Sequence, residues 1–365
     1  MKRVGVGIIG CGNISPAYLK AAKGFPILDI IALADANPRA AEARASEFGL
    51  QARSIDALLA DPAIEIVVNL TIPKAHVEVG LQAVAAGKHV HSEKPLGINV
   101  AEARKLIEAA EAKGVRLGCA PDTFLGGAHQ TARKLIDEGA IGQPIGGTAF
   151  FMCPGHESWH PNPGFYYLCG GGPMLDMGPY YITDLVNLLG PVARVSGMAT
   201  RLRGERLITS EPLKGTVIPV EVATHVTGTL AFVSGAVVTV TMSFDVPKHR
   251  HTPLEIYGDK ASLLVPDPNY FGGAIEYAGI GEDWRTIPTQ HAYADGNYRI
   301  IGVADMAHAI RDGRPHRASG ALAFHVLEVM EAFERSSNSG AVVAIESRPA
   351  RPAMLPVGLA PGELD

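Results

Sequence analysis

The chain has 365 residues and a formal net charge of −5, with 47% hydrophobic and 19% charged residues. This composition is that of an ordinary globular protein with ample core, and the length predicts two domains. The acidic balance provides no basic surface for nucleic acid or an anionic membrane, so neither is an expected partner. The four cysteines (Cys11, Cys119, Cys153 and Cys169) form no C-x-x-C pair, which favours a reduced cytoplasmic protein.

The first expected strand, residues 4–9, leads into a glycine turn, Gly10-Cys11-Gly12-Asn13-Ile14-Ser15, and then a short helix. A dinucleotide-binding fingerprint requires this strand–turn–helix context. Gly10 permits the tight turn, Gly12 lets the backbone approach a pyrophosphate, and the helix N-terminus offers N–H groups to an anion. Ser15 replaces the third glycine of the fingerprint and is small enough for close packing. We therefore place Gly10, Gly12, Asn13 and Ile14 in a cofactor site.

A second apolar strand, residues 28–34, ends in Asp35, about 20 residues beyond the glycine turn. At this spacing a carboxylate hydrogen-bonds the ribose of NAD and would repel the 2′-phosphate of NADP. The alternative is that Asp35 caps the helix beginning at Pro38, although Asn37 is the better candidate for that cap. We expect NAD as the cofactor, and NADP less.

Strands and helices alternate up to residue 120. The expected helices cover residues 38–48, 55–59, 74–86 and 100–112, and the expected strands cover residues 64–70 and 115–119, with a further short strand before residue 93. This alternation predicts a doubly wound parallel sheet, in a first domain that we assign to residues 1–122.

A carboxylate, an amine and a proline stand on consecutive residues in Glu93-Lys94-Pro95, directly after that short strand. A residue before proline is disfavoured in the helical region, so we expect Lys94 to be extended at a strand end. Open α/β sheets bind ligands at such strand ends. The alternative is that Glu93 and Lys94 form an ion pair in a polar turn at the surface, without a functional role.

Beyond residue 120 the pattern changes. The segments are a helix (128–137), a strand (145–152), a loop rich in proline and aromatic residues (153–167), a helix (173–189), successive strands (193–277), two helices (301–311 and 321–335) and an extended tail from residue 348. Successive strands without helices between them predict a largely antiparallel sheet. We assign residues 123–365 to a second, α+β domain, whose tail is expected to pack back on the first.

The helix expected over residues 173–189 has a polar face opposite its apolar one. Asp176, Tyr180 and Asp184 are spaced by four, and the absence of basic residues suits a face that borders a cleft. Pro179 either lies in the first turn of a helix that begins near Leu175 or bends the helix. The alternative is that Asp176 is a cap and Tyr180 a half-buried core residue.

The loop at residues 153–167, called the aromatic loop below, predicts recognition of a ring. Trp159 offers a flat face to the C–H side of a sugar, and His156, His160 and Asp122 offer polar partners. His156 and His160 also have the H-x-x-x-H spacing of a metal site. Nearby prolines argue against a regular helix and no third ligand is evident, so we predict no metal.

These motifs resemble the Gfo/Idh/MocA family of glucose–fructose oxidoreductase and inositol dehydrogenase. The resemblance rests on Gly10-Cys11-Gly12-Asn13, on Thr71-Ile72-Pro73 with His76, on Glu93-Lys94-Pro95, and on Gly171-Gly172-Pro173-Met174-Leu175-Asp176-Met177-Gly178. It implies a Rossmann domain followed by a domain whose open sheet often mediates oligomers, here a dimer or tetramer. It also implies NAD(P)-dependent redox chemistry on sugars or polyols. By position it adds Thr71, Pro73, His76 and Glu93 to the cofactor site.

By the same resemblance, Lys94 matches a lysine that approaches both nicotinamide and substrate, and Asp176 an aspartate of the substrate pocket. Many relatives have a histidine where this chain has Tyr180, which leaves the proton acceptor open. We expect burial and the nicotinamide charge to lower the pKa of Lys94. Lys94 and Tyr180 would then form a coupled proton-handling pair, with Asp176 orienting substrate hydroxyls.

The expected activity is NAD-dependent oxidation of a secondary hydroxyl of a sugar, glycoside or cyclitol. Two alternatives stay open. One is an enzyme that uses bound NAD transiently for glycoside cleavage or epimerisation, without net redox change. The other is a non-catalytic protein that senses a dinucleotide.

Overall fold

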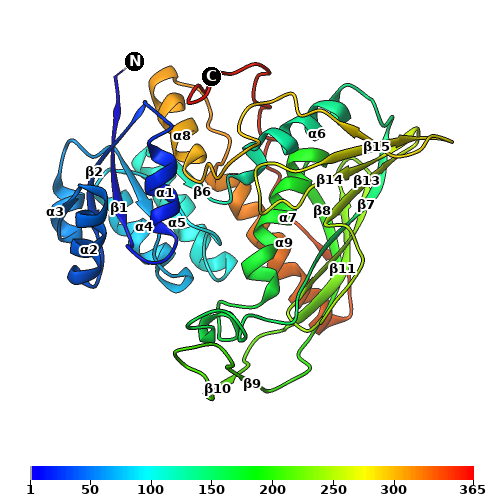
Figure 1. Ribbon diagram of the computed structural model, residues 1–365, viewed down its shortest axis with the longest axis horizontal. Coiled ribbons are helices and arrows are strands. Elements are labelled where there is room, and N and C mark those ends of the chain that lie inside the picture. The colour runs from blue at the N-terminus through cyan, green and yellow to red at the C-terminus, as the bar shows by residue number, and fades with distance from the viewer. Residues whose placement is uncertain (1) are drawn as a thin grey trace.

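The computed structural model describes residues 2–365, so the first residue of the predicted N-terminal domain lies outside the described range. Six strands form its first sheet: β1 (Val4–Ile9), β2 (Leu28–Ala34), β3 (Gln51–Ala52), β4 (Ile66–Asn69), β5 (His89–Ser92) and β6 (Leu117–Cys119). They are ordered β3-β2-β1-β4-β5-β6, and every neighbouring pair is parallel (Figure 1). This is the strand order of a Rossmann domain, which confirms the predicted fold of this half.

Helices connect these strands: α1 (Ser15–Ala22), α2 (Pro38–Phe48), α3 (Ile55–Ala60), α4 (His76–Ala85) and α5 (Val100–Lys113), with a 3₁₀ turn η1 (Pro73–Ala75) before α4. Asn37 caps α2, because its side chain accepts a hydrogen bond from the backbone N–H of Arg39, and Gly49 ends the helix in the left-handed conformation. Since Asn37 supplies the cap, Asp35 is free for another role.

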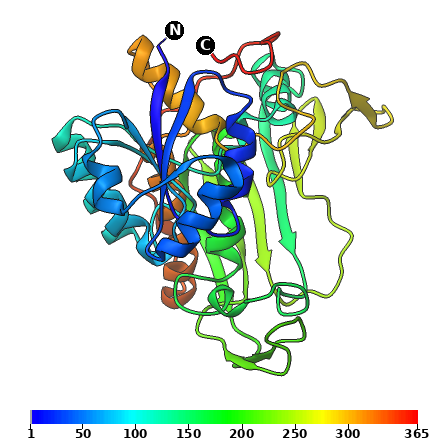
Figure 2. The same cartoon turned by 60° about the vertical axis from the view of Figure 1, so that its left-hand side comes forward.

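The second half contains a nine-stranded sheet. Its strands are β7 (Pro144–Met152), β8 (Val192–Thr200), β11 (His225–Phe232), β12 (Val237–Ser243), β13 (Leu254–Gly258), β14 (Ala261–Val265), β15 (Ile275–Gly279), β16 (Arg285–Ile287) and β17 (Val343–Ala344). Their order is β16-β15-β14-β13-β7-β12-β11-β8-β17, and within this sheet, as far as residues 2–365 are described, only the β7–β12 pair is parallel. The prediction of a largely antiparallel sheet is confirmed. A small hairpin, β9 (Glu205–Leu207) with β10 (Val217–Pro219), projects at the lower end of the molecule (Figure 2).

Helices of the second half pack on both sheets. They are α6 (Gly127–Asp137), α7 (Pro173–Leu189), α8 (Ile301–Asp312) and α9 (Gly320–Ser339), with 3₁₀ turns η2 (Thr123–Leu125) and η3 (Gly164–Tyr166). Figure 1 shows α7 and α9 in the middle: α7 packs on β11 and β12, and α9 contacts β8 on one side and α5 on the other. The sheet thus holds α7 with its N-terminal end toward the parallel sheet.

Two features of α7 differ from simple expectation. The helix begins at Pro173, so Pro179 lies inside it rather than in its first turn. Asp184, expected on a cleft face, is fully buried and its carboxylate lies 2.8 Å from Nδ1 of His129 in α6. The expectation for Asp184 is wrong because α6 covers this part of the helix.

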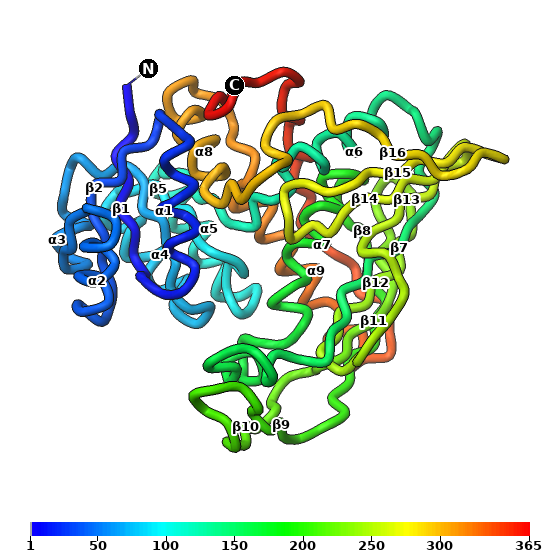
Figure 3. Tube along the Cα trace, viewed as in Figure 1, coloured from blue at the N-terminus to red at the C-terminus, as the bar shows by residue number. Residues whose placement is uncertain are grey.

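The two halves are joined by more than the connection near residue 122. The backbone N–H of Cys119 in β6 donates to the carbonyl of Ala318, just before α9. The C-terminal tail runs back to the same region (Figure 3), where Arg317 binds the carboxylate of Asp365 at 2.6 Å. We propose that the boundary between the two domains lies at residue 122.

No helix within residues 2–365 is long and apolar enough to cross a membrane.

Candidate active site

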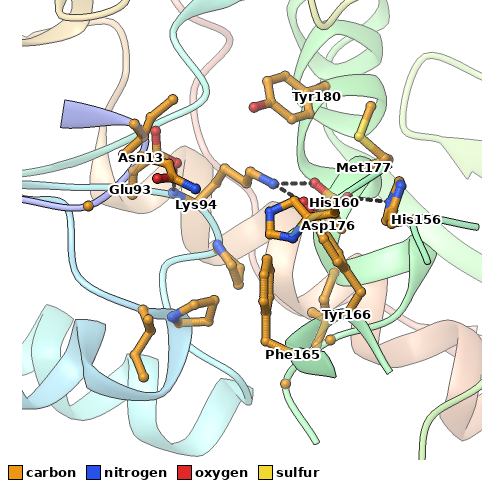
Figure 4. A pocket seen from close by; sticks show the side chains of 18 of the residues that line it. Asn13, Glu93, Lys94, His156, His160, Phe165, Tyr166, Asp176, Met177 and Tyr180 are labelled. Atoms are coloured by element: carbon orange, nitrogen blue, oxygen red, sulfur yellow. Dashed lines mark hydrogen bonds and ion pairs between the residues drawn. The ribbon is translucent and has the colours of Figure 1, made fainter. Parts of the chain in front are cut away.

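A cavity of about 840 Å³ opens between the two halves of the molecule. The loops that follow β1, β4 and β5 line one side of it, and the first turns of α7 and the aromatic loop line the other. Figure 4 shows the side chains that converge from both sides. The cavity therefore lies at the carboxyl ends of the parallel strands, where open α/β sheets bind ligands.

Lys94 reaches from the end of β5 across the cavity to Asp176 in the first turns of α7 (Figure 4). Its Nζ lies 2.6 Å from Oδ1 of Asp176 and 2.7 Å from the backbone oxygen of the same residue. The second carboxylate oxygen of Asp176 lies 3.7 Å from Nε2 of His156, which is an electrostatic contact rather than a hydrogen bond. The side chains of Lys94 and Asp176 are only 16% and 19% exposed, so the ion pair is largely shielded from water.

The ionic state of this pair differs from the expected one. Burial raises the pKa of the Asp176 carboxyl, but the charge of Lys94 and the contact with His156 lower it more, to about 2. Burial lowers the pKa of the Lys94 ammonium, but the negative charge of Asp176 and its other neighbours raise it more, so the net pKa lies above the ordinary lysine value. The expectation of a lowered pKa for Lys94 rested on burial and the nicotinamide charge and left out Asp176, which raises this pKa as a direct partner.

Tyr180 lies one turn after Asp176 and also lines the cavity. It is 7% exposed, and Nζ of Lys94 lies 5.2 Å from the centre of its ring. In Figure 4 its hydroxyl and the Lys94 ammonium lie on the same side of the cavity. The structure thus brings Lys94, Asp176 and Tyr180 together, as the spacing and the resemblance predicted.

Glu93 supports the turn that carries Lys94. One carboxylate oxygen accepts a hydrogen bond from the Tyr18 hydroxyl at 2.7 Å, and the other accepts from the backbone N–H of Lys94 at 2.8 Å. Burial and the Glu93 charge raise the pKa of Tyr18 well above its ordinary value, which keeps the phenol a donor. Glu93 also borders the cavity, so it both braces Lys94 and faces a ligand.

The glycine turn has the geometry that its sequence predicted. Gly10 has φ +107°, and a Cβ atom there would lie 2.5 Å from the carbonyl of Leu70, so only glycine fits. A Cβ at Gly12 would meet only open space, and Gly12, Asn13 and Ile14 line the cavity. The turn thus presents its backbone to the cavity just before the N-terminus of α1.

Asp35 does not line this cavity but a second hollow beside α2 and α3. Its carboxylate accepts hydrogen bonds from the backbone N–H groups of Cys11, at 2.7 Å, and Asn37, at 2.8 Å. Because Cys11 belongs to the glycine turn, this turn connects the hollow at Asp35 with the main cavity. An extended ligand that follows the turn can reach both.

Thr71 and Pro73, from the loop after β4, line the cavity, but His76 does not. The ring of His76 is completely buried and lies 2.7 Å from the carbonyl oxygen of Pro95 and 2.9 Å from that of Thr71. His76 therefore ties the Thr71 loop to the Lys94 turn, and its predicted cofactor contact is replaced by a bracing role.

The aromatic loop forms the outer wall of the cavity, to which it contributes His156, Trp159, His160, Phe165 and Tyr166. The rings of His156 and Tyr166 pack at an interplanar angle of 52° with centres 4.1 Å apart, while Trp159 remains 61% exposed. Within residues 2–365, no cluster of three or more His, Cys, Asp or Glu side chains is arranged to hold a metal ion.

Asp122, expected as a substrate partner, lies elsewhere. It is 1% exposed and does not line the cavity; its Oδ2 accepts hydrogen bonds from the backbone N–H groups of Ile300 and Gly302, both at 3.0 Å. Burial raises the pKa of its carboxyl to about 6, although these hydrogen bonds oppose the rise. The structure thus corrects the expectation: Asp122 holds the start of α8.

Sequence reasoning missed three residues on the wall next to Tyr180: Asn269, Tyr270 and Arg299. They come from irregular segments that follow β14 and β16, where the sequence shows no motif. The sequence offered only two signals for them. All three follow a strand end, and Arg299 is the one Lys or Arg among the polar and aromatic residues of segment 291–300.

Two family models match the chain. Residues 4–120 match the oxidoreductase family with an NAD-binding Rossmann fold, and residues 129–264 match the Gfo/Idh/MocA C-terminal domain. Levoglucosan dehydrogenase of Pseudarthrobacter phenanthrenivorans is 25% identical over 92% of this chain and 97% of that protein. The 1,5-anhydro-D-fructose reductase of Ensifer adhaerens is 31% identical, over 47% of this chain and 52% of its own.

Solved structures agree on the fold. Levoglucosan dehydrogenase in complex with NADH and L-sorbose superposes with a TM-score of 0.84 at 24% identity, over 95% of this chain and 100% of that one. The Rossmann half, the second domain and the order of the motifs thus coincide with one family along most of the sequence. The chain belongs to the Gfo/Idh/MocA family of NAD-binding oxidoreductases.

Proposed function

We propose that this enzyme oxidises a secondary hydroxyl of a sugar, glycoside or cyclitol, with NAD as the hydride acceptor. The observation that carries the proposal is the Lys94–Asp176 ion pair beside Tyr180, at the carboxyl edge of the parallel sheet. A relative named levoglucosan dehydrogenase, which matches 92% of the chain, supports a sugar as the substrate class. The exposed aromatic wall around Trp159 supports it too, because flat rings pack on the C–H faces of sugars.

The residues present fit a dinucleotide. The crowded Gly10 and the open Gly12 let a pyrophosphate approach the backbone before α1, and Asp35 offers carboxylate oxygens to a ribose. Thr71 and Pro73 would flank the nicotinamide end, near Lys94. When bound, NAD supplies the acceptor for the hydride that leaves the substrate carbon.

The ionic state of the site divides the roles of its residues. Asp176 keeps Lys94 charged, so the ammonium is suited to stabilise negative charge on the substrate oxygen rather than to accept a proton. Asp176 keeps one carboxylate oxygen toward His156 and can orient a second substrate hydroxyl. Tyr180 is then the group that exchanges the hydroxyl proton with the substrate.

The test is an assay of NADH formation with sugars, glycosides and inositols, with NADP in parallel. Lys94→Ala and Tyr180→Phe should each lower kcat about a hundredfold or more, with nearly unchanged NAD affinity. Lys105→Ala, at an exposed position of α5, is the control for loss of a lysine. Full activity in Lys94→Ala would contradict the assignment.

A second candidate, glycoside cleavage or epimerisation with bound NAD, makes a different prediction in the same assay. Substrate would then be converted while no NADH accumulates, and the cofactor would remain with the protein during purification. Product analysis by chromatography distinguishes the two activities.

A further inference from the structure

Tyr180 receives a hydrogen bond from Arg299, a residue outside every motif of the sequence. Nη2 of Arg299 lies 3.2 Å from the Tyr180 hydroxyl oxygen, and its guanidinium carbon lies 5.9 Å from the ring centre. A guanidinium only donates hydrogen bonds, so the tyrosine oxygen is the acceptor. The hydroxyl proton of Tyr180 must therefore point away from Arg299, and the cavity that both residues line lies on the remaining side.

The charge of Arg299 is not neutralised by a direct partner. Lys94 is paired with Asp176, and Glu93 accepts hydrogen bonds from Tyr18 and the Lys94 backbone. Within residues 2–365, no carboxylate lies within ion-pair distance of Arg299. The neutral side-chain oxygen of Asn269, 3.0 Å away, is the other acceptor of the same Nη2. The positive charge is therefore available to the oxygen of Tyr180.

The backbone next to Arg299 is held in a costly conformation. Ile300 has φ +104°, a region that β-branched residues rarely adopt and that costs on the order of 1–3 kcal/mol. Asp122 holds this conformation through its two hydrogen bonds to the N–H groups of Ile300 and Gly302. Strain of this kind persists only where the surroundings impose it, and it concentrates at functional sites. Here the strained residue directly follows Arg299.

We propose that Arg299 is a positioning residue of the reaction, which turns the Tyr180 hydroxyl proton toward the substrate oxygen and stabilises the tyrosine oxygen when it carries negative charge. The inference rests on the proposed function. In oxidation, the substrate O–H bond would break and its proton would pass to the deprotonated Tyr180 oxygen, which becomes the phenol, while the electron pair of the C–H bond would leave as hydride to bound NAD. In reduction, the Tyr180 O–H bond breaks and its proton passes to the substrate carbonyl oxygen.

The chemical reason is that a free phenol titrates near pH 10 and is a poor base at neutral pH unless cations stand beside it. The charged or titratable groups around Tyr180 and Arg299 come from several segments: Tyr18 of α1, Glu93 and Lys94 after β5, Asp122 before η2, His156, His160 and Tyr166 of the aromatic loop, Asp176 of α7, Tyr270 after β14, and Arg299 itself. Asp176 is paired with Lys94, and Glu93 acts on Arg299 only through space, so Arg299 is the cation in hydrogen-bond contact with the Tyr180 oxygen.

The test compares Arg299→Met and Arg299→Lys with wild type over a range of pH. Arg299→Met should lower kcat at neutral pH tenfold or more, with little change in KM. The pH at which kcat reaches half its maximum should rise by about one unit, because the oxygen has lost a neighbouring cation. Arg299→Lys should show a smaller fall in kcat and a smaller rise in this pH, because it keeps a positive charge. Arg285→Met is the matched control, since this guanidinium also stacks on a tyrosine ring, that of Tyr277 at 4.6 Å, far along the sheet.

A second readout needs no turnover. The pH-dependent ultraviolet absorbance of tyrosinate, taken as wild type minus Tyr180→Phe, should move to higher pH when the same difference is measured in the Arg299→Met background. An unchanged titration together with an unchanged kcat–pH profile overturns the inference, even if kcat falls, because a purely structural role would lower kcat alone. If the wild type formed no NADH with any substrate, the proposed function would be refuted instead. The absorbance titration would still test whether Arg299 acts on the Tyr180 hydroxyl.

Discussion

Replacement of Asp176 by asparagine removes one charge of the Lys94 ion pair and nearly preserves its shape. The 2.6 Å separation corresponds to about 6 kcal/mol of gross attraction at an effective dielectric constant of about 20. Desolvation of both ions cancels most of this gain. The lowering of the Asp176 pKa from 3.8 to about 2 corresponds to a net stabilisation of about 2 kcal/mol. We expect Asp176→Asn to lower the free energy of unfolding by about this amount at neutral pH.

The stabilisation has a defined pH window. The pKa of Asp176 is lower in the folded than in the unfolded chain, so its contribution is complete well above 3.8 and disappears as pH falls through about 2. The raised pKa of Lys94 acts in the opposite sense: its contribution is complete below 10.5 and is lost only as pH rises beyond that value. The difference between wild type and Asp176→Asn should therefore be constant from about pH 5 to about pH 9.

Urea unfolding of both proteins at about pH 7 and about pH 3 measures this difference, which should shrink to about 1 kcal/mol at the lower pH. Asp283→Asn, at an exposed position, is the control for loss of an aspartate. Turnover of Asp176→Asn should fall tenfold or more, since Lys94 loses the carboxylate that holds it. A stability difference below about 0.5 kcal/mol, with no dependence on pH, would refute the reasoning.

Three further substitutions probe the cofactor site, the aromatic wall and its support. Asp35→Ala should weaken NAD binding about tenfold and NADP binding less, as measured by calorimetric titration; equal losses would speak against ribose recognition. Trp159→Ala should raise KM for the sugar severalfold with kcat little changed, and a loss confined to kcat would contradict a binding role. Arg206→Met leaves the partly buried carboxylates of Glu157 and Asp245 without their cation, so urea unfolding should show a loss of about 3 kcal/mol; a loss below 1 kcal/mol would contradict this account.

Local signals explain how closely the parallel half could be predicted. The helix at residues 38–48 has the predicted ends, because Asn37, Pro38 and Gly49 each act on their own neighbourhood. The glycine turn also has a local signal, because Gly10 has φ +107°, which favours glycine; the contact with the loop after β4 that also requires glycine there is not local. The meeting of Lys94 and Asp176, 82 positions apart, is not local. It was predicted only because several motifs in order resembled a known family.

Predictions failed where a polar residue has partners far away in the sequence. Asp122 is a carboxylate after a strand end, which is typical of a ligand-binding residue, yet its partners are backbone groups 178 and 180 positions later. Asp184 had the correct helix spacing for a cleft, but α6 covers it and supplies His129. Periodicity tells which residues share a face of a helix, but not which other element packs against that face.

The position of Tyr180 shows how these distant contacts bear on chemistry. The resemblance left the proton acceptor open between Lys94 and Tyr180, and in the structure Lys94 is held in an ion pair with Asp176, which favours the charged form of the lysine. We propose that the phenol serves instead, aided by a positive charge next to its oxygen. Arg299 provides that charge from a segment without any motif, and Asp122 accepts a hydrogen bond from the strained backbone of the next residue, Ile300. Asp122, expected to bind the substrate, thus bears on the reaction from outside the cavity.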